Sequence, residues 1–244
     1  MASLMRQHQA KVKKQQAEAQ AKANLDSQEA VHIETLAGDY NQFQLLLNSL
    51  ESDIQRLSGL SLEDKTALKR DELVPRYQPV VQAYIEACVN GEEPYKNPVL
   101  VELIVWLFDI GEVQQALDLA YIAIDQEQES PERFKSTLHT LVVDQVWQWA
   151  ELQINNGDPV EPYMGSLIIA IVDREWVVKP ASLSRLYKFA GKAKQKTNEP
   201  SDLLAALEYF KTAQRLDPKR SQVKTVIEKL EKALEKQPPK QPES

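Results

Sequence analysis

The chain has 244 residues, of which 43% are hydrophobic and 27% charged, which is enough apolar mass for the core of one or two domains. It contains 7 glycines and a single cysteine, Cys88, which argues against glycine-dependent phosphate loops, disulfide frameworks and zinc clusters. The longest apolar run, residues 99–110, is interrupted by Glu102 and Asp109, so we expect no membrane span. The abundance of the helix formers Ala, Leu, Glu, Gln and Lys predicts an all-α protein.

Charge is distributed unevenly along the chain. Residues 1–24 carry a net charge of +4, residues 25–178 one of −18, and residues 179–244 one of +7. Because a polyanion responds to the local field, the two basic ends are candidate nucleic-acid contacts despite the overall charge of −7. We interpret residues 1–24 as a flexible basic arm, although its lysines could also simply solvate a mobile end, and it lacks the apolar stretch of a secretory signal. The candidate DNA contacts in this arm are Arg6, Lys11, Lys13, Lys14 and Lys22.

Apolar residues in the next segment, residues 25–60, alternate at spacings of three and four. This heptad pattern is typical of a coiled coil and predicts a coiled-coil-like helix that joins copies of the chain into a homo-oligomer. A single amphipathic helix that packs on its own domain remains an alternative. The helix is expected to end at Ser58-Gly59. The heptad seam consists of Ile33, Leu36, Tyr40, Phe43, Leu47, Leu50, Ile54 and Leu57.

Residues 61–236 predict a helical domain built as a series of packed hairpins, and the polar, proline-rich tail 237–244 is expected to be disordered. Ser61 is the expected N-cap of a first helix that runs toward Pro75, and Pro75 and Pro79 are expected to separate it from the next helix. Ser130-Pro131 predicts another helix start. Further helices are expected over residues 80–89, 97–126 with a break at 109–111, 131–155, 161–173, 181–195, 200–216 and 221–236.

Two of these segments, which begin at Gly111 and Asp202, resemble the second half of a tetratricopeptide repeat. They lie about 90 residues apart rather than in tandem, which favours packed hairpins that are only partly tetratricopeptide-like over a true repeat solenoid. A helical-repeat adaptor that binds proteins and no nucleic acid is therefore an alternative function.

The sequence contains no recognisable catalytic constellation. Residues 191–197 lack the second glycine of a phosphate loop, so no ATP site is expected. His8, His32 and His139 are too scattered for a zinc site or a cysteine-histidine pair. The acidic pairs lie on predicted helices, where solvated faces explain them better than a magnesium-dependent nuclease. We expect no catalytic residue, no cofactor and no metal site.

One combination of motifs extends over residues 68–91, 97–124 and 203–234. A lysine-arginine pair precedes Leu-x-Pro and a second proline, and a tryptophan, an Asp-x-Gly-Asp/Glu motif and an Ala-Leu helix follow. In this combination the chain resembles the small terminase subunit of temperate myophages. One departure is that only Lys240 is basic after Lys236, whereas members of that family can end in a long basic tail. The residues that carry the resemblance are Lys69, Arg70, Leu73, Pro75, Pro79, Trp106, Asp109, Gly111, Glu112, Ala116 and Leu117.

The resemblance implies a role in viral DNA packaging. Small terminases bind the packaging site on concatemeric double-stranded phage DNA as homo-oligomers and present it to the large terminase subunit, which carries the ATPase and nuclease, in the cytoplasm of the infected bacterial host. The family is labelled as an endonuclease subunit, but with no nuclease motif visible we expect catalysis in the large subunit. The implied partners are duplex DNA, the large subunit and copies of the chain itself, with no membrane.

Overall fold

The structure is a computed structural model that describes residues 41–197 and 199–235. All regular secondary structure in these residues is helical, so the all-α prediction is confirmed. The chain divides into two units after Gly59. Within the described residues, every helix is too short or too polar to cross a bilayer. The tail 237–244 and all residues before the first described helix, 1–40, lie outside the described residues.

The described part of the first unit is one helix over residues 41–58. It ends at the predicted Ser58-Gly59 boundary, where the Ser58 hydroxyl donates to the carbonyl of Gln55 at 2.7 Å. A coiled coil formed by this helix stays a prediction.

The second unit begins with α2 (Leu62–Leu68), capped by Ser61 as predicted. The Ser61 hydroxyl accepts a hydrogen bond from the backbone N–H of Asp64 at 3.2 Å, which satisfies one of the free donors at the helix start.

The expected break at Pro75 and Pro79 is wrong. The chain passes from α2 through a π-helical turn, η1 (Lys69–Leu73), directly into α3 (Val74–Val89). Pro75 and Pro79 each remove one backbone N–H donor from this continuous run, and the π-helical turn lies directly before them. The two prolines are therefore accommodated inside continuous helical structure.

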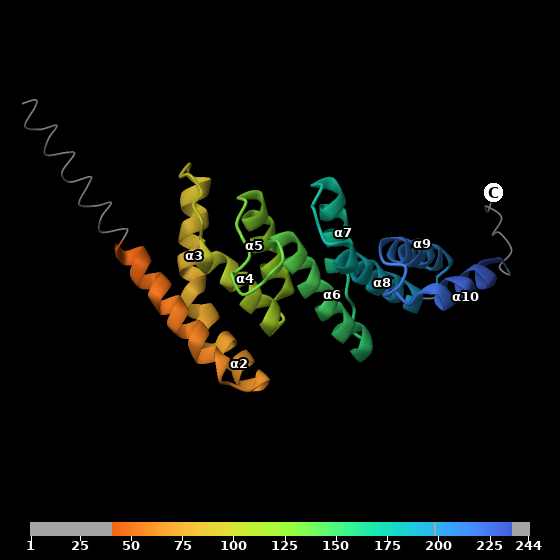
Figure 1. Cartoon of the computed structure of the whole chain (residues 1–244), viewed down its shortest axis with the longest axis horizontal. Helices are drawn as coiled ribbons and strands as arrows, with labels where there is room; N and C mark the ends of the chain where they lie inside the picture. Colours follow the sequence, from red (N-terminus) through yellow and green to blue (C-terminus); the bar gives the residue numbers. More distant parts are fainter. Residues whose placement is uncertain (1–40, 198, 236–244) are drawn as a thin grey trace, which may run out of the picture. The chain divides into compact units, whose positions relative to one another are not determined.

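Helix α4 (Pro98–Ile110) is buried on all sides, since every residue from Val99 to Phe108 is buried. It packs against α3 and against α5 (Val113–Asp125). The turn between α4 and α5 is made by Gly111, whose φ of 86° lies in the left-handed region that favours glycine. Figure 1 shows α4 lying between α3 and α5 in the second unit.

Helix α6 (Leu138–Asn156) starts later than predicted. Residues 131–137 are not α-helical, and the N-cap is Thr137, whose hydroxyl accepts from the N–H of Thr140 at 3.4 Å. The Ser130 hydroxyl donates instead to the carbonyl of Ser136. A tertiary contact explains the difference, because Arg133 in this segment forms a two-pronged ion pair with the buried Glu102 of α4.

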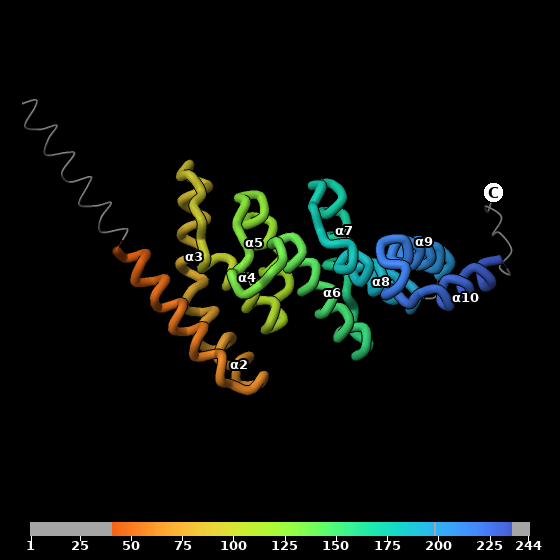
Figure 2. Tube along the Cα trace, viewed as in Figure 1, coloured from red at the N-terminus to blue at the C-terminus, as the bar shows by residue number. Residues whose placement is uncertain are grey.

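The remaining helices are α7 (Tyr163–Asp173), α8 (Pro180–Thr197), α9 (Pro200–Leu216) and α10 (Lys224–Glu235). Helices α8 and α9 form the most extensive pair in the second unit, and Figure 2 shows them side by side. A compact apolar cluster joins α9 to α10, with Phe210 at 1% exposure among its members. A tetratricopeptide-like arrangement of these helices stays a prediction.

Gly191 explains why α8 and α9 approach so closely. It lies in the middle of α8, and a Cβ atom at this position would lie 2.9 Å from the Phe210 ring of α9. The glycine that opens the failed phosphate-loop pattern is therefore a packing residue within a helix.

Candidate functional site

The DNA contacts predicted in the basic arm, Arg6, Lys11, Lys13, Lys14 and Lys22, all lie outside the described residues. They stay a prediction.

The heptad seam is described in part. Ile33, Leu36 and Tyr40 lie outside the described residues, and the later members lie on the helix over residues 41–58. Self-association through the seam stays a prediction. Leu50 and Leu57 are buried, and Phe43, Leu47 and Ile54 are half-buried.

The motif residues of the second unit meet around the junction of η1, α3 and α4. The Lys69 ammonium lies 2.6 Å from a carboxylate oxygen of Asp109, so this ion pair ties the π-helical turn to the end of α4. The two side chains are 13% and 35% exposed, which places the pair at the edge of the core. Residues 40 positions apart in the sequence thus form one contact.

The aromatic centre of this motif cluster is the pair of Tyr77 and Trp106. Their rings meet edge to face, with centroids 5.6 Å apart at an angle of 62°. Tyr77 is fully buried, as is Leu73, and Trp106 is 1% exposed. Because none of these rings is available to stack on a base, their role is to pack α3 against α4.

The other motif residues also have structural positions. Gly111 and Glu112 form the turn into α5, and Ala116 and Leu117 are buried on that helix. Arg70 is exposed on the π-helical turn. The motif residues therefore hold the fold together, and the motif pattern indicates a common fold rather than a common catalytic reaction.

A buried polar network continues this core beyond α3. The Tyr84 hydroxyl lies 2.9 Å from the side-chain oxygen of Gln126 and 3.1 Å from the carbonyl of Tyr95, and it accepts from the Gln128 side-chain amide at 3.3 Å. Gln128 in turn accepts from the backbone N–H of Asn97 at 2.8 Å, so the network connects α3, the loop before α4 and the end of α5. Burial raises the pKa of Tyr84 to about 12, which keeps the hydroxyl neutral and able to donate.

A sequence comparison identifies the family to which this core belongs. The family model described as phage small terminase subunit matches residues 47–177, more than half of the chain. The chain belongs to the phage small terminase subunit family. No solved structure matches it.

Two curated relatives of the terminase family are similar over much of the chain. One is the "Probable terminase, endonuclease subunit" of Haemophilus phage HP1, 31% identical over 176 residues, which are 72% of this chain and 61% of the relative. The other is the "Terminase, endonuclease subunit" of Escherichia phage P2, 23% identical over 205 residues, which are 83% of this chain and 78% of the relative. The chain therefore spans less than two thirds of the HP1 protein.

The terminase family match ends at residue 177, and the basic part of the structure begins after it. On α10 and the turn before it, the sequence suggests that Glu228, Glu231 and Glu235 neutralise neighbouring lysines through helical pairs. Glu231 instead forms an ion pair with Lys211 of α9 at 3.0 Å. The exposed cations of this surface, which we call the α10 surface, are Lys219, Arg220, Lys224 and Lys229.

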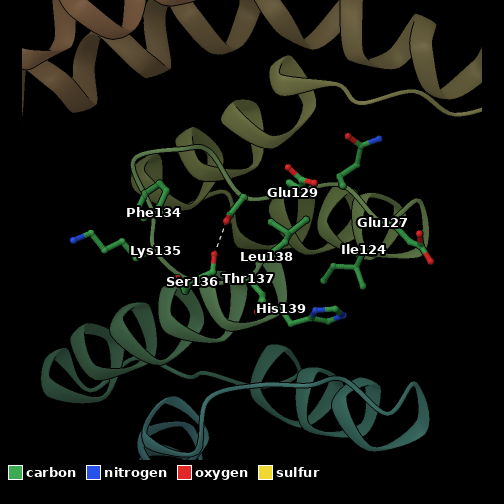
Figure 3. A pocket seen from close by; sticks show the side chains of 11 residues that line it. Ile124, Glu127, Glu129, Phe134, Lys135, Ser136, Thr137, Leu138 and His139 are labelled. Atoms are coloured by element: carbon green, nitrogen blue, oxygen red, sulfur yellow. Dashed lines mark hydrogen bonds between the residues drawn. The ribbon is translucent and has the colours of Figure 1, made fainter.

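A hollow with a volume of about 580 Å³ lies between the end of α5 and the start of α6. Figure 3 shows Leu138 near its centre, with Lys135 on one side and Glu127 on the other. His139 lines it and packs against Trp176 with ring centroids 5.3 Å apart. Burial lowers the pKa of His139, and no nucleophilic side chain in the hollow is hydrogen-bonded to it, so the hollow offers no acid-base pair.

Within residues 41–197 and 199–235, no group of three or more histidine, cysteine or acidic residues could hold a metal ion. Glu102, the most buried of the acidic residues on α4, is engaged by Arg133 rather than free to bind a cation. No local pattern in the sequence signals this pair, because its members are 31 positions apart.

Proposed function

We propose that this chain acts in phage DNA packaging as the DNA-binding small subunit of a terminase. In this proposal it binds the packaging site on concatemeric duplex DNA as a homo-oligomer and presents the DNA to the large subunit, in the host cytoplasm. The observation that carries the proposal is the family match over residues 47–177, which includes the core built around Lys69, Trp106 and Asp109.

DNA binding by the basic arm follows from charge and copy number. An arm of +4 neutralises about four phosphates, which gives a salt slope near −4 and only weak non-specific binding at physiological salt. Several arms gathered by an oligomer act on one duplex at high effective concentration and bind much more tightly. Residues 25–178, at −18, repel DNA from the surface that they form.

The experiment that tests DNA binding is a gel shift with duplex DNA over a series of salt concentrations. We expect salt-dependent binding by the full chain, and weaker binding with a flatter salt slope for a chain that lacks residues 2–22. A matched variant in which the lysines of the arm become arginines keeps the charge and should keep the slope. A full chain that binds no DNA would favour the alternative function of a helical-repeat adaptor that binds proteins. If the chain without residues 2–22 binds DNA as the full chain does, the DNA contact lies outside the arm.

The oligomer is tested at the heptad seam. Leu47→Asp places a charge in the middle of the seam, where each copy would have to bury it without a partner. We expect the particle to dissociate in sedimentation. A variant that keeps the native mass would contradict the seam as the oligomer contact.

Cutting and ATP hydrolysis are assigned to the large subunit in this proposal. The HP1 and P2 relatives are named as endonuclease subunits. We nevertheless expect the purified chain alone neither to hydrolyse ATP nor to cleave DNA, because its sequence has no phosphate loop and no nuclease motif. Magnesium-dependent cleavage that one carboxylate substitution abolishes would contradict this assignment.

A further inference from the structure

All charged side chains of helix α8 are basic. Its basic residues are Arg185, Lys188, Lys192, Lys194 and Lys196, and it has no acidic residue. Arg185, Lys188 and Lys192 follow one another at spacings of three and four, which places them on one side of the helix. We call these three residues the α8 cationic face.

The α8 cationic face is not neutralised by carboxylates. Among the described residues, none lies within ion-pair distance of Arg185, Lys188 or Lys192, whereas Lys194 on another side of the helix pairs with Asp202 at 3.2 Å. Burial and the charge of Lys192 lower the pKa of Lys188, and Arg185 adds to this effect, while Glu151 on α6 opposes it. The like charges of the face thus act on one another directly.

Two of the three cations are held in place by aromatic rings. The Trp147 ring of α6 and the Phe189 ring of α8 stack with centroids 5.9 Å apart and planes 5° apart. The Arg185 guanidinium lies 4.9 Å from the Trp147 ring centroid, and the Lys192 ammonium lies 4.6 Å from that of Phe189. A ring attracts a cation without cancelling its charge, so the rings position Arg185 and Lys192 and leave them able to attract an anion.

The dimensions of the face match a nucleic-acid backbone. At a rise of about 1.5 Å per residue the α8 cationic face extends over about 10 Å of helix. A DNA duplex presents about six phosphate charges over that length. The two rings beneath the face contact each other and the cations, and Phe189 is only 5% exposed, so contact with phosphates is favoured over stacking on unpaired bases.

We propose that Arg185, Lys188 and Lys192 form a phosphate-binding face for duplex DNA, in addition to the basic arm. This inference rests on the proposed DNA-binding function and assigns it a surface on the folded domain, beyond the residues that match the family model. Contacts to phosphate carry no sequence information, so the face adds affinity and orientation rather than recognition of the packaging site.

The test measures binding of the full chain to a duplex of about 30 base pairs by fluorescence anisotropy at several salt concentrations. The variant Arg185→Gln/Lys188→Gln/Lys192→Gln removes the face, and Lys219→Gln/Lys224→Gln/Lys229→Gln removes the same charge from the α10 surface as a matched control. We expect the first variant to flatten the salt slope by about 2.7 and to weaken binding at about 0.1 M salt on the order of 100-fold. The control should lose markedly less, because no aromatic ring of the described residues holds its three lysines in place as Trp147 and Phe189 hold Arg185 and Lys192.

The outcomes separate this inference from the proposed function. A parent chain that binds DNA with a steep salt slope, together with an α8 variant of equal slope, overturns the inference and leaves the proposed function standing. Equal losses in both variants also overturn it, because they indicate a general charge effect. A parent chain that binds no DNA overturns the proposed function itself.

Two single variants protect the test against a folding defect. Lys188→Gln touches no ring contact and should flatten the slope by about 0.9. Arg185→Lys keeps the charge and should keep the slope of the parent.

Discussion

The hairpin of α4 and α5 and the hairpin of α8 and α9 use their residues in opposite ways. Helix α4 buries every residue from Val99 to Phe108, all of them apolar except Glu102, and it lies within the segment that matches the terminase family model. Helix α8 buries one side against α9, presents cations on another, and lies beyond that segment. The comparison teaches that the family pattern marks a core, whereas the cations to which we assign DNA binding lie outside the matched segment.

The largest effect is expected from a core substitution in residues 47–177, the segment that matches the family model. Trp106→Ala should lower the free energy of unfolding by about 3–5 kcal/mol, because the ring is 1% exposed and packs against Tyr77. Denaturant unfolding measures the loss. Trp149→Ala, at a half-buried tryptophan of α6, is the matched control and should cost less. Equal losses would mean that α4 is not the centre of the core.

The second test concerns the close approach of α8 and α9. Gly191→Ala should cost about 1–3 kcal/mol, because the new methyl group collides with the Phe210 ring. Adding Phe210→Leu should recover part of this loss in a thermal unfolding experiment. Gly59→Ala is a suitable control, since no atom lies within 4 Å of the place that its new methyl group would take, and little change is expected. A Gly191→Ala protein as stable as the Gly59→Ala protein would show that the two helices can separate freely.

The third test removes one hydroxyl from the polar network next to α4. Tyr84→Phe should cost about 1–2 kcal/mol at neutral pH, because it leaves buried amide and carbonyl groups without a partner. The control is Tyr163→Phe, whose hydroxyl makes no hydrogen bond to the described residues.

The effect of Tyr84 should also depend on pH. Burial raises the pKa of Tyr84 from 10.0 to about 12 in the folded chain. Its stabilising contribution is therefore complete below pH 10 and is lost as the pH rises through about 12. The difference in unfolding free energy between the parent and Tyr84→Phe should shrink over this range, and a constant difference would contradict the role of the neutral hydroxyl.

The smallest expected effect is at the edge of the matched core. Lys69→Met should cost less than about 1 kcal/mol, because ion pairs near the surface contribute little. A double-mutant cycle with Asp109→Asn measures the coupling between the two side chains, which lie 2.6 Å apart. A coupling well above this value would mean that the pair is a central part of the fold.

Local signals in the sequence predicted most helix boundaries in the second unit. Ser61 begins α2, Gly111 separates α4 from α5, and Gly157 ends α6 with a φ of 91°. Each of these depends on the chemistry of one residue and its neighbours, so a single sequence contains the information.

The errors arose where distant residues decide the structure. Ser130-Pro131 has the form of a helix start, but Arg133 is held by Glu102 of another helix, and α6 begins only at Leu138. The two prolines of α3 have the form of a break, but the packing of Tyr77 on Trp106 favours a continuous helix.

The same limit applies to the candidate sites. The spacing of Arg185, Lys188 and Lys192 is visible in the sequence, but the position of Trp147 beneath Arg185 depends on how α6 packs on α8. The sequence shows which residues are basic. Only the fold shows which of them contact an aromatic ring instead of forming an ion pair with a carboxylate.

The π-helical turn at Lys69–Leu73 fixes the rotational phase between α2 and α3. Within it the N–H of Val74 bonds to the carbonyl of Lys69, five residues earlier, so the turn holds one residue more than an α-helical turn. Because the hydrogen bond spans five residues instead of four, the turn absorbs its extra residue as a bulge, and the helices on either side keep the rotational register of a regular helix one residue shorter. Deleting one residue from this turn should therefore restore regular helix without rotating α2 relative to α3.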